Sequence, residues 1–331
     1  MRVLVLSHRD VVAALPPQAC AESMAAVLAA RARGETHMPL RSLMAAPGAA
    51  GFMGLMPSWR GGQPDHGAVF ALKAICVIPD NPTRGLDAHQ GTVTLFDGET
   101  GVPTAILDAS AITAIRTAAV TAVATGLLAR ADARTLAILG AGVQGQAHLR
   151  ALAGVRDFGQ VRVYAPTRAH VAALINGSGL TGTELSAAAS AEDAVRGADV
   201  VVAATNAREP VLQRAWLKAG AHVNAVGAST PRAREIDTAT VAASALFCDS
   251  RESVLAEAGE FQLAVTEGLI GGQEHIRAEL GEVLAGTTAG RRDDGELTLF
   301  RSLGIAVEDL AAAETAVAAA RAQGLGTEVE L

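Results

Sequence analysis

The second half of the chain alternates between short apolar runs and segments with helical spacing. The runs are uninterrupted, as expected for parallel strands buried on both faces; they read TLAILG, QVRVYA, ADVVVAAT, HVNAVG and SALFCD. The segments between them, such as QGQAHLRAL and ESVLAEAGEFQLAV, have the apolar spacing of helices. Regular alternation of the two predicts a doubly wound parallel sheet of the α/β class.

The first part of the chain, to about residue 118, has a different pattern. The segment QACAESMAAVLAARARG has helical spacing and stops at Gly34. Three β-like runs follow and predict antiparallel strands, because turn-forming residues separate HGAVFALKAICVIPDNP, GTVTLFDGETG and VPTAILDAS. One Ala-rich helix from residue 117 leads into the first parallel strand. Another follows residue 300, ends near Gly324, and is expected to pack back on the N-terminal part.

Three glycines, Gly140, Gly142 and Gly145, follow the first predicted parallel strand and open a helix. In a G-x-G-x-x-G loop the first glycine permits a tight turn and the second lets the backbone approach a pyrophosphate. The third lets helix and strand pack closely, and the helix N-terminus faces the phosphate charge. Because the loop sits between a strand and a helix, it predicts a dinucleotide cofactor.

The end of the second predicted strand bears on which dinucleotide binds. An NAD site usually has an acidic residue there, for the ribose 2′-hydroxyl. This strand ends VYAPTRAH, without an acid, and Thr167 and Arg168 could meet a 2′-phosphate instead. The pattern favours NADP, while NAD remains open because Arg168 could equally be a solvated residue in the first helical turn.

Composition and charge exclude several kinds of partner. The net charge is −7 and no basic stretch could follow a phosphate backbone, so we expect no nucleic acid. Residues 8–10 interrupt the N-terminal apolar run, and no run reaches the ~18 apolar residues of a membrane span. Cys20, Cys76 and Cys248 are widely spaced and form no CxxC pair, so we expect no metal site and a reducing cytoplasm.

Three cations stand in apolar surroundings before the glycine loop. Lys73 lies in AVFALKAICVIP, Arg116 lies in AITAIRTAAV, and Arg41 follows HMPL. Burial would lower the pKa of such a lysine toward the range useful for proton transfer. If the three converge they would form a clamp for a carboxylate, although each alone could be structural. His89 is a second possible proton relay or a structural histidine.

Several blocks, in order along nearly the whole chain, resemble the ornithine cyclodeaminase/mu-crystallin family. They read ALKAICVIPDNP, GTVTLFDGETGVPTAILDAS, IRTAAVTAVAT, ILGAGVQGQAHL, VNAVGAS and FRSLGIAVEDLAAA. The resemblance implies a Rossmann domain, residues 119–304, inserted in a discontinuous α+β domain of residues 1–118 and 305–331. The latter would bind the substrate and form a homodimer by pairing its sheet with that of a second copy.

The resemblance also implies roles for particular residues. Arg41, Lys73 and Arg116 fall where the family binds the substrate carboxylate and the nearby imine, which makes them the candidate catalytic residues. Met56 and Pro57, in LMPSW, match the family's pocket loop. Together with Ser229, these residues form the candidate substrate site.

One departure from the family pattern bears on the reaction. Ornithine cyclodeaminases carry an acidic residue shortly after the NAVG strand, whereas this chain reads NAVGASTPRAREID and has Ser229 there. A serine hydroxyl cannot replace a carboxylate as a general base without activation. Ketimine reductases of the mu-crystallin type resemble this chain in having serine at that turn.

The prediction is therefore an NAD(P)H-dependent oxidoreductase that reduces a 2-imino acid to an amino acid, or catalyses the reverse dehydrogenation. The alternatives are a cyclodeaminase with tightly bound NAD, and a non-catalytic protein that binds small carboxylates. A dicarboxylate substrate would need a further cation, such as Arg60 or Arg232. The candidate cofactor-binding residues are Gly140, Gly142, Val143, Gln144, Gly145, Thr167, Arg168, Thr205, Asn206, Val226, Gly227 and Ser229.

Overall fold

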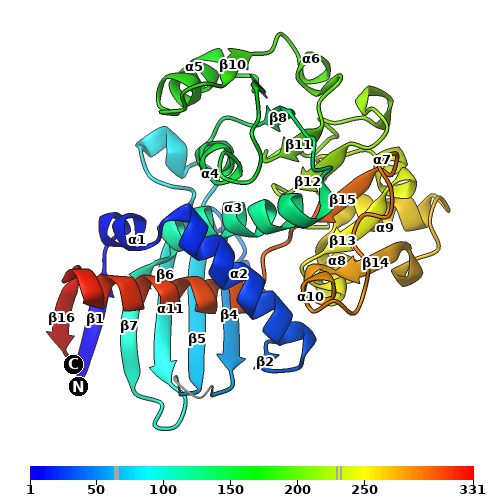
Figure 1. The fold of residues 1–331 in the computed structure, drawn as a ribbon. Coiled ribbons are helices and arrows are strands. Elements are labelled where there is room, and N and C mark those ends of the chain that lie inside the picture. The colour runs from blue at the N-terminus through cyan, green and yellow to red at the C-terminus, as the bar shows by residue number, and fades with distance from the viewer. Residues whose placement is uncertain (63–66, 229, 232) are drawn as a thin grey trace. The chain divides into compact units, whose positions relative to one another are not determined.

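The computed structural model describes residues 1–62, 67–228, 230–231 and 233–331. They divide into two compact units, one of Met1–Arg116 with Gly304–Leu331 and one of Thr117–Leu303. The chain leaves the first unit, builds the second and returns, as the colours of Figure 1 show. These boundaries lie close to the predicted ones at residues 118 and 305.

The first unit is built on a mixed sheet of eight strands among the described residues. The strand order is β16-β1-β7-β6-β5-β4-β2, and β3 pairs with β4. Strand β1 pairs parallel with β7 and antiparallel with β16, so the two ends of the chain are neighbours in one sheet. The strands are β1 (Arg2–Leu6), β2 (Thr36–His37), β3 (Ser42–Met44), β4 (Phe52–Arg60), β5 (Val69–Val77), β6 (His89–Asp97), β7 (Pro103–Asp108) and β16 (Thr327–Glu330).

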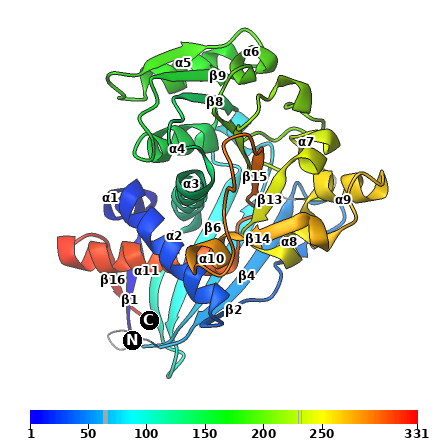
Figure 2. The same cartoon turned by 45° about the vertical axis from the view of Figure 1, so that its right-hand side comes forward.

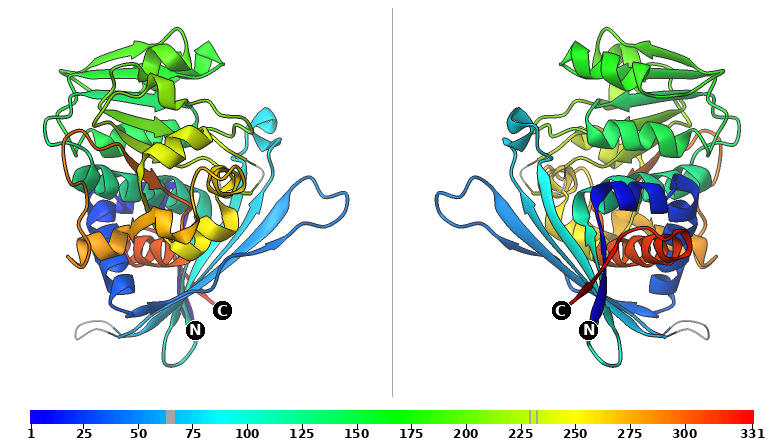
Figure 3. Two further views of the ribbon diagram at one scale, coloured as in Figure 1. Left: turned by 90° about the vertical axis from the view of Figure 1, so that its right-hand side faces the viewer. Right: turned by 90° about the vertical axis from the view of Figure 1, so that its left-hand side faces the viewer.

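Helices cover one face of this sheet (Figure 3). They are α1 (His8–Ala14), α2 (Pro17–Ala32) and α11 (Ala306–Gln323), and α11 packs against β4, β5, β6 and α2. Many alanines in α11 let it approach its neighbours closely, and Gly324 ends it in the left-handed conformation at φ 68°. The predicted return of the C-terminal helix to the N-terminal part is confirmed.

The second unit contains a parallel sheet, so the predicted α/β class with a doubly wound sheet is confirmed. Its strand order is β10-β9-β8-β11-β12-β15-β13-β14. Figure 2 shows β8 and β9 toward one end of this sheet and β13 and β14 toward the other. The strands are β8 (Thr135–Leu139), β9 (Gln160–Tyr164), β10 (Glu184–Ala187), β11 (Val200–Ala203), β12 (His222–Ala225), β13 (Ala245–Cys248), β14 (Ile276–Glu279) and β15 (Thr298–Arg301). Strands β10, β14 and β15 were not among the five predicted strands, and β15 inserts between β12 and β13.

Both faces of this sheet are buried, which explains the continuous apolar runs. In β11, Val201 packs into one apolar cluster, while Val200 and Val202 pack into another on the opposite face. The helices of the unit are α4 (Val143–Leu152), α5 (Arg168–Asn176), α6 (Ala191–Val195), α7 (Thr238–Ala243), α8 (Arg251–Glu257), α9 (Gly259–Thr266) and α10 (Leu280–Leu284).

Helix α3 (Ala109–Leu128) contains the point where the chain enters the second unit. Its length and composition would allow it to cross a membrane. However, 67% of its most apolar window is buried inside the protein, as in the core helix of a globular domain. We therefore interpret its apolar character as a consequence of packing.

Candidate functional site

In the first unit, two of the three predicted cations are joined by a buried carboxylate. Lys73, on β5, is 3% exposed, and its Nζ lies 2.7 Å from Oδ2 of Asp309 in the first turn of α11. The other oxygen, Oδ1, accepts a hydrogen bond from Nε of Arg116 at 2.9 Å. Asp309 thus bridges β5 and α3 through two cations.

Arg116 and Arg41 have further partners in the same unit. Nη1 of Arg116 donates to Oε2 of Glu308 at 3.1 Å, and Nη2 of Arg41 donates to the carbonyl of Gly304 at 2.9 Å. Gly304 has a φ of 73°, and a Cβ there would lie 2.4 Å from Nη1 of Arg116. Only glycine fits this turn, which holds the carbonyl toward Arg41.

The picture of three isolated cations therefore needs correction, because Glu308 and Asp309 accompany them. Both acids were overlooked in the sequence, where they stand side by side at the start of a helix and resemble ordinary first-turn acids. Burial raises the pKa of Asp309, but the charges of Arg116 and Lys73 outweigh this, so the pKa lies below its ordinary value. Burial lowers the pKa of Lys73 to about 8, even though Asp309 opposes the shift.

Met56 and Pro57 lie within strand β4 and not in the predicted pocket loop, which corrects that prediction. Met56 is 5% exposed, and its register partner on β5 is Lys73. On the side of β4 away from β5, β2 pairs with Trp59 and Arg60, and β3 pairs with residues 53–55. Among the described residues Pro57 therefore has no strand partner on this side, where a missing N–H is tolerated.

Two further candidates from the sequence, Arg60 and His89, also lie in the first unit. Arg60 donates to both carboxylate oxygens of Glu314, at 3.0 and 2.7 Å, and to the carbonyls of Gly61 and Gly67. This guanidinium is therefore engaged within its own unit. His89 is the first residue of β6 and is exposed. Desolvation and, to a smaller extent, the charges of Lys73 and Arg116 lower the pKa of its imidazole.

In the second unit, the glycine loop lies at the carboxyl end of β8. Gly140 has a φ of 109°, and a Cβ there would lie 2.3 Å from the carbonyl oxygen of Ala204. A Cβ at Gly145 would lie 2.1 Å from the carbonyl oxygen of Gly140, so the start of α4 touches the turn. A Cβ at Gly142 would have open space around it, within the described part of the chain.

The start of α4 is suited to a dinucleotide. Gly142 is the N-cap and provides no side-chain acceptor for the first N–H groups of this ten-residue helix, which begins at Val143. Oε1 of Gln144 is buried and has no hydrogen-bond partner among the described residues. The strand order reverses between β8 and β11, the point at which doubly wound sheets bind ligands at the carboxyl ends of the strands.

The other candidate cofactor residues follow neighbouring strands. Thr167 is the N-cap of α5 and Arg168 its first residue, both exposed after β9. Thr205 and Asn206 follow β11, and Val226 and Gly227 follow β12. Ser229 and Arg232 lie outside the described residues. The predicted cofactor residues that the structure describes in this unit thus follow the carboxyl ends of β8, β9, β11 and β12.

Glu235 was overlooked in the sequence and lies at the same edge of the sheet. It is fully buried, and its carboxylate accepts hydrogen bonds from residues after both β11 and β12. Burial raises the pKa of Glu235 to about 7, although its hydrogen bonds with Thr205 and Gly227 oppose this shift. No spacing pattern in the sequence marks it.

Two comparisons with known sequences bear on this architecture. Residues 1–323 match the model of the ornithine cyclodeaminase/mu-crystallin family. The chain belongs to this family. A relative named ketimine reductase mu-crystallin, from Mus musculus, is 36% identical over 284 residues, 85% of this chain and 84% of that protein. Iminosuccinate reductase of Paracoccus denitrificans strain Pd 1222 is 34% identical over 333 residues, 99% of this chain and 100% of that protein.

Solved structures agree with the family assignment. Thermococcus litoralis Δ1-pyrroline-2-carboxylate reductase, in complex with NADH and L-proline, has a TM-score of 0.94 at 35% identity. The comparison covers 99% of this chain and 100% of that one. An archaeal alanine dehydrogenase dimer with bound NAD has a TM-score of 0.92 at 30% identity, covering 100% of both chains. The family resemblance predicted from the sequence is confirmed.

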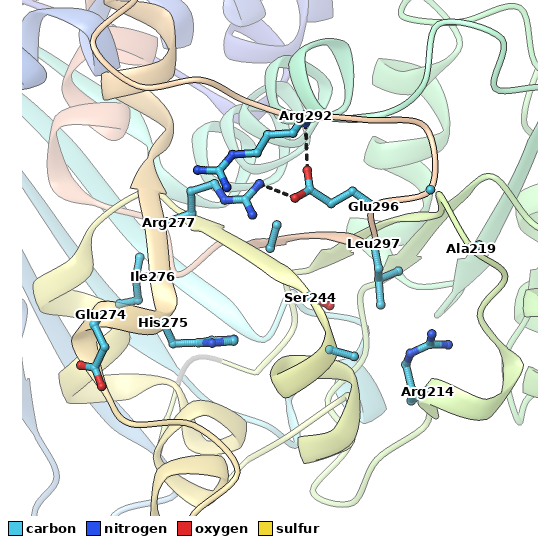
Figure 4. Close-up of a pocket in the computed structure, with 13 residues that line it drawn as sticks. Arg214, Ala219, Ser244, Glu274, His275, Ile276, Arg277, Arg292, Glu296 and Leu297 are labelled. Atoms are coloured by element: carbon cyan, nitrogen blue, oxygen red, sulfur yellow. Dashed lines mark hydrogen bonds and ion pairs between the residues drawn. The ribbon is translucent and has the colours of Figure 1, made fainter.

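A separate cavity of 690 Å³ lies at the amino ends of β13, β14 and β15, the edge of the sheet opposite to the glycine loop (Figure 4). Arg277 pairs with Glu296 at its wall, and the backbone N–H of Arg292 also donates to Glu296. Since ligands of this family's Rossmann unit are expected at the carboxyl ends of the strands, this cavity is not the cofactor site.

Gly142, the N-cap of α4, and Gly145, in the first turn of α4, provide a matched test of the loop. Gly145→Ala should lower the free energy of unfolding by ~1–3 kcal/mol, because the added methyl meets the backbone of Gly140. Gly142→Ala should leave stability almost unchanged and weaken NADH or NADPH binding, because it enters the open space at the helix N-terminus. Chemical denaturation and cofactor titration measure the two effects. Equal effects of both variants on both measurements would contradict this division of roles.

Proposed function

We propose that this chain reduces a 2-imino acid to an amino acid with NADH or NADPH, and can catalyse the reverse dehydrogenation. The observation that carries the proposal is the charge cluster of the first unit, in which Lys73, Arg116, Glu308 and Asp309 are buried and Arg41 is half-buried. Arg41, Lys73 and Arg116 provide three positive charges, and Glu308 and Asp309 provide two negative ones. Guanidinium groups in this position suit a substrate that carries a carboxylate.

A purely structural role explains this cluster poorly. Buried ion pairs lose several kcal/mol per ion on leaving water, and apolar residues of similar volume are often as stable or more stable. Binding of a ligand carboxylate by the arginines would give the cluster a function, since guanidinium groups suit bidentate carboxylate binding.

Each residue can be given a role in the reaction. Arg41 and Arg116 hold the carboxylate, and thereby fix the position of the neighbouring C=N carbon. The Lys73 ammonium, which Asp309 holds in place, donates a proton to the imine nitrogen. The nicotinamide, when bound at the carboxyl ends of β8, β11 and β12, supplies the hydride.

The comparisons support the cofactor class, because the similar structures contain NADH or NAD. We propose NADPH as the preferred form, since β9 ends without an acidic residue and is followed by Thr167 and Arg168. For the substrate, we propose an imino acid with one carboxylate. The engagement of Arg60 by Glu314 supports this, as it removes one cation that a second carboxylate would need.

An imine panel tests the proposed reaction. NADH and NADPH oxidation would be followed with Δ1-pyrroline-2-carboxylate, Δ1-piperideine-2-carboxylate, iminosuccinate, and pyruvate or glyoxylate with methylamine. Oxidation should depend on the imine, be faster with the monocarboxylates, and fall ~10²-fold or more in Arg116→Ala and Lys73→Ala, which each remove a charged partner of the substrate. Ornithine converted to proline and ammonia, with no cofactor consumed in the panel, would overturn the proposal.

The protonation of Lys73 predicts a pH profile. Because its pKa is about 8, kcat/KM should fall as pH rises above 8 and the ammonium loses its proton. The charges facing Lys73 are those of Asp309, Arg116 and Arg41. Asp309→Asn removes the one that raises its pKa, so the alkaline limb should move to lower pH.

Glu314→Gln is the matched control for that profile, because Glu314 lies on the same helix and pairs with Arg60. It should leave the alkaline limb where it is in the wild type. A limb that stays in place in Asp309→Asn, or shifts equally in both variants, would show that Asp309 does not set the protonation of Lys73.

We also propose a cytoplasmic homodimer, joined through the sheet face of the first unit that its helices leave uncovered. In the described part of the unit this face carries Leu55, Pro57 and Phe70, and Phe70 is 47% exposed beside Trp59. An apolar face of this kind is typical of a subunit interface. The similar alanine dehydrogenase structure is described as a dimer, which supports the proposal.

Light scattering tests the dimer. The wild type should have the mass of two chains, and Phe70→Glu should give monomers, because it places a charge on the apolar face. Leu269→Glu is the control, since Leu269 is 50% exposed in the other unit. A monomeric wild type, or a dimer that tolerates Phe70→Glu, would exclude this interface.

A further inference from the structure

Glu235 connects the ends of two neighbouring strands of the parallel sheet. Its Oε1 accepts hydrogen bonds from the backbone N–H of Thr205 at 2.5 Å and from the Thr205 hydroxyl at 2.8 Å. Its Oε2 accepts from the backbone N–H groups of Gly227 at 2.5 Å and Ala228 at 3.3 Å. One fully buried carboxylate therefore satisfies four donors, three of them from the backbone.

These donors lie just beyond the point where the strand ladder ends. The register of β11 and β12 runs to Ala203 and Ala225, and one further backbone bond joins Val226 to Ala203. Beyond this bond, the residues that follow β11 and β12 form loops that are not paired with each other as strands. Glu235 supplies the acceptors that the missing ladder would have provided.

The carboxylate is itself held in place. The backbone carbonyl of Glu235 accepts hydrogen bonds from the N–H groups of Val211 and Leu212, at 2.8 and 3.0 Å. The next residue, Ile236, forms a parallel bridge with Leu212. The side chain thus projects from a segment fixed to the protein and not from a free loop.

Gly227 shows how closely the two strand ends approach. A Cβ there would lie 1.9 Å from the carbonyl oxygen of Thr205 and 2.7 Å from Oε1 of Glu235. No other residue could bring the chain after β12 so near to the chain after β11. The approach and the four hydrogen bonds define one shape for this part of the sheet edge.

The place of these strands indicates which half of the cofactor they serve. A doubly wound sheet has two mononucleotide-binding halves that meet where the strand order reverses. Here β8, β9 and β10 form the half with the glycine loop, and β11, β12 and β15 form the other. The first half receives the adenosine part and the pyrophosphate. The nicotinamide part therefore falls to the strand ends that Glu235 joins.

We propose that Glu235 is a positioning residue that shapes the nicotinamide half of the cofactor site. The inference rests on the nicotinamide cofactor of the proposed function, and not on the identity of the imine. Glutamine at this position keeps the size of the side chain but places an NH₂ group against N–H donors, so at least one strand end loses its acceptor.

The test compares a whole cofactor with a probe of its adenosine half. Titration of wild type and Glu235→Gln with NADH, NADPH and ADP gives the dissociation constants. The variant should bind the preferred dinucleotide ~10-fold or more weakly, since a buried donor without an acceptor weakens binding by that order. Its affinity for ADP should change less than about twofold, because the glycine loop is untouched.

Asp237→Asn is the matched control, because Asp237 lies two residues further on and caps α7 by accepting from the N–H of Thr240. It should lose stability without changing the ratio of the two affinities. An equal loss of dinucleotide and ADP binding in Glu235→Gln, or no loss of either, would overturn the inference. A wild type that binds the cofactor yet reduces no imine would contradict the proposed reaction and leave this test decisive.

Discussion

The ion pairs of Asp309 with Lys73 and Arg116 are the interaction on which the first unit depends. Arg116 and Asp309 are 193 positions apart in the sequence. The two ion pairs therefore tie the returning C-terminal helix to α3 and, through Lys73, to the sheet. Removing Asp309 would take the carboxylate partner from the buried ammonium of Lys73, and breaking a buried pair in this way typically costs ~3–5 kcal/mol. The same bonds fix the two cations that the proposed substrate needs, so folding and function rest on one carboxylate.

The second unit depends on a different constraint, the close approach of backbone segments at the carboxyl ends of the strands. Gly140 lies against the chain after β11, and Gly227 lies against Thr205. Side chains larger than hydrogen would keep these segments apart. The cofactor edge is thus built from backbone groups, and Glu235 supplies the acceptors where the ladder no longer does.

Much of this fold could be predicted from sequence, because buried parallel strands and Ala-rich helices leave periodic patterns. Strand β15 was missed, since its four residues follow a long loop and its place between β12 and β13 is decided by tertiary pairing. Lys73 and Arg116 stood out as cations in apolar runs. Their partners Glu308 and Asp309 did not, because acids at a helix start are common and a contact across the chain leaves no local signal. The loop predicted at Met56 is a strand, and among the described residues neither β2 nor β3 pairs with Pro57, which suits a proline at a strand edge.

The central claim is that hydride reaches the carbon of an imine whose carboxylate is held by the cations of the first unit. Mass spectrometry of the amino acid formed from Δ1-pyrroline-2-carboxylate with NADH or NADPH deuterated at C4 tests it most directly. The account predicts one deuterium at the α-carbon of proline, from one of the two C4-labelled epimers only. Proline formed without deuterium from either epimer would contradict it.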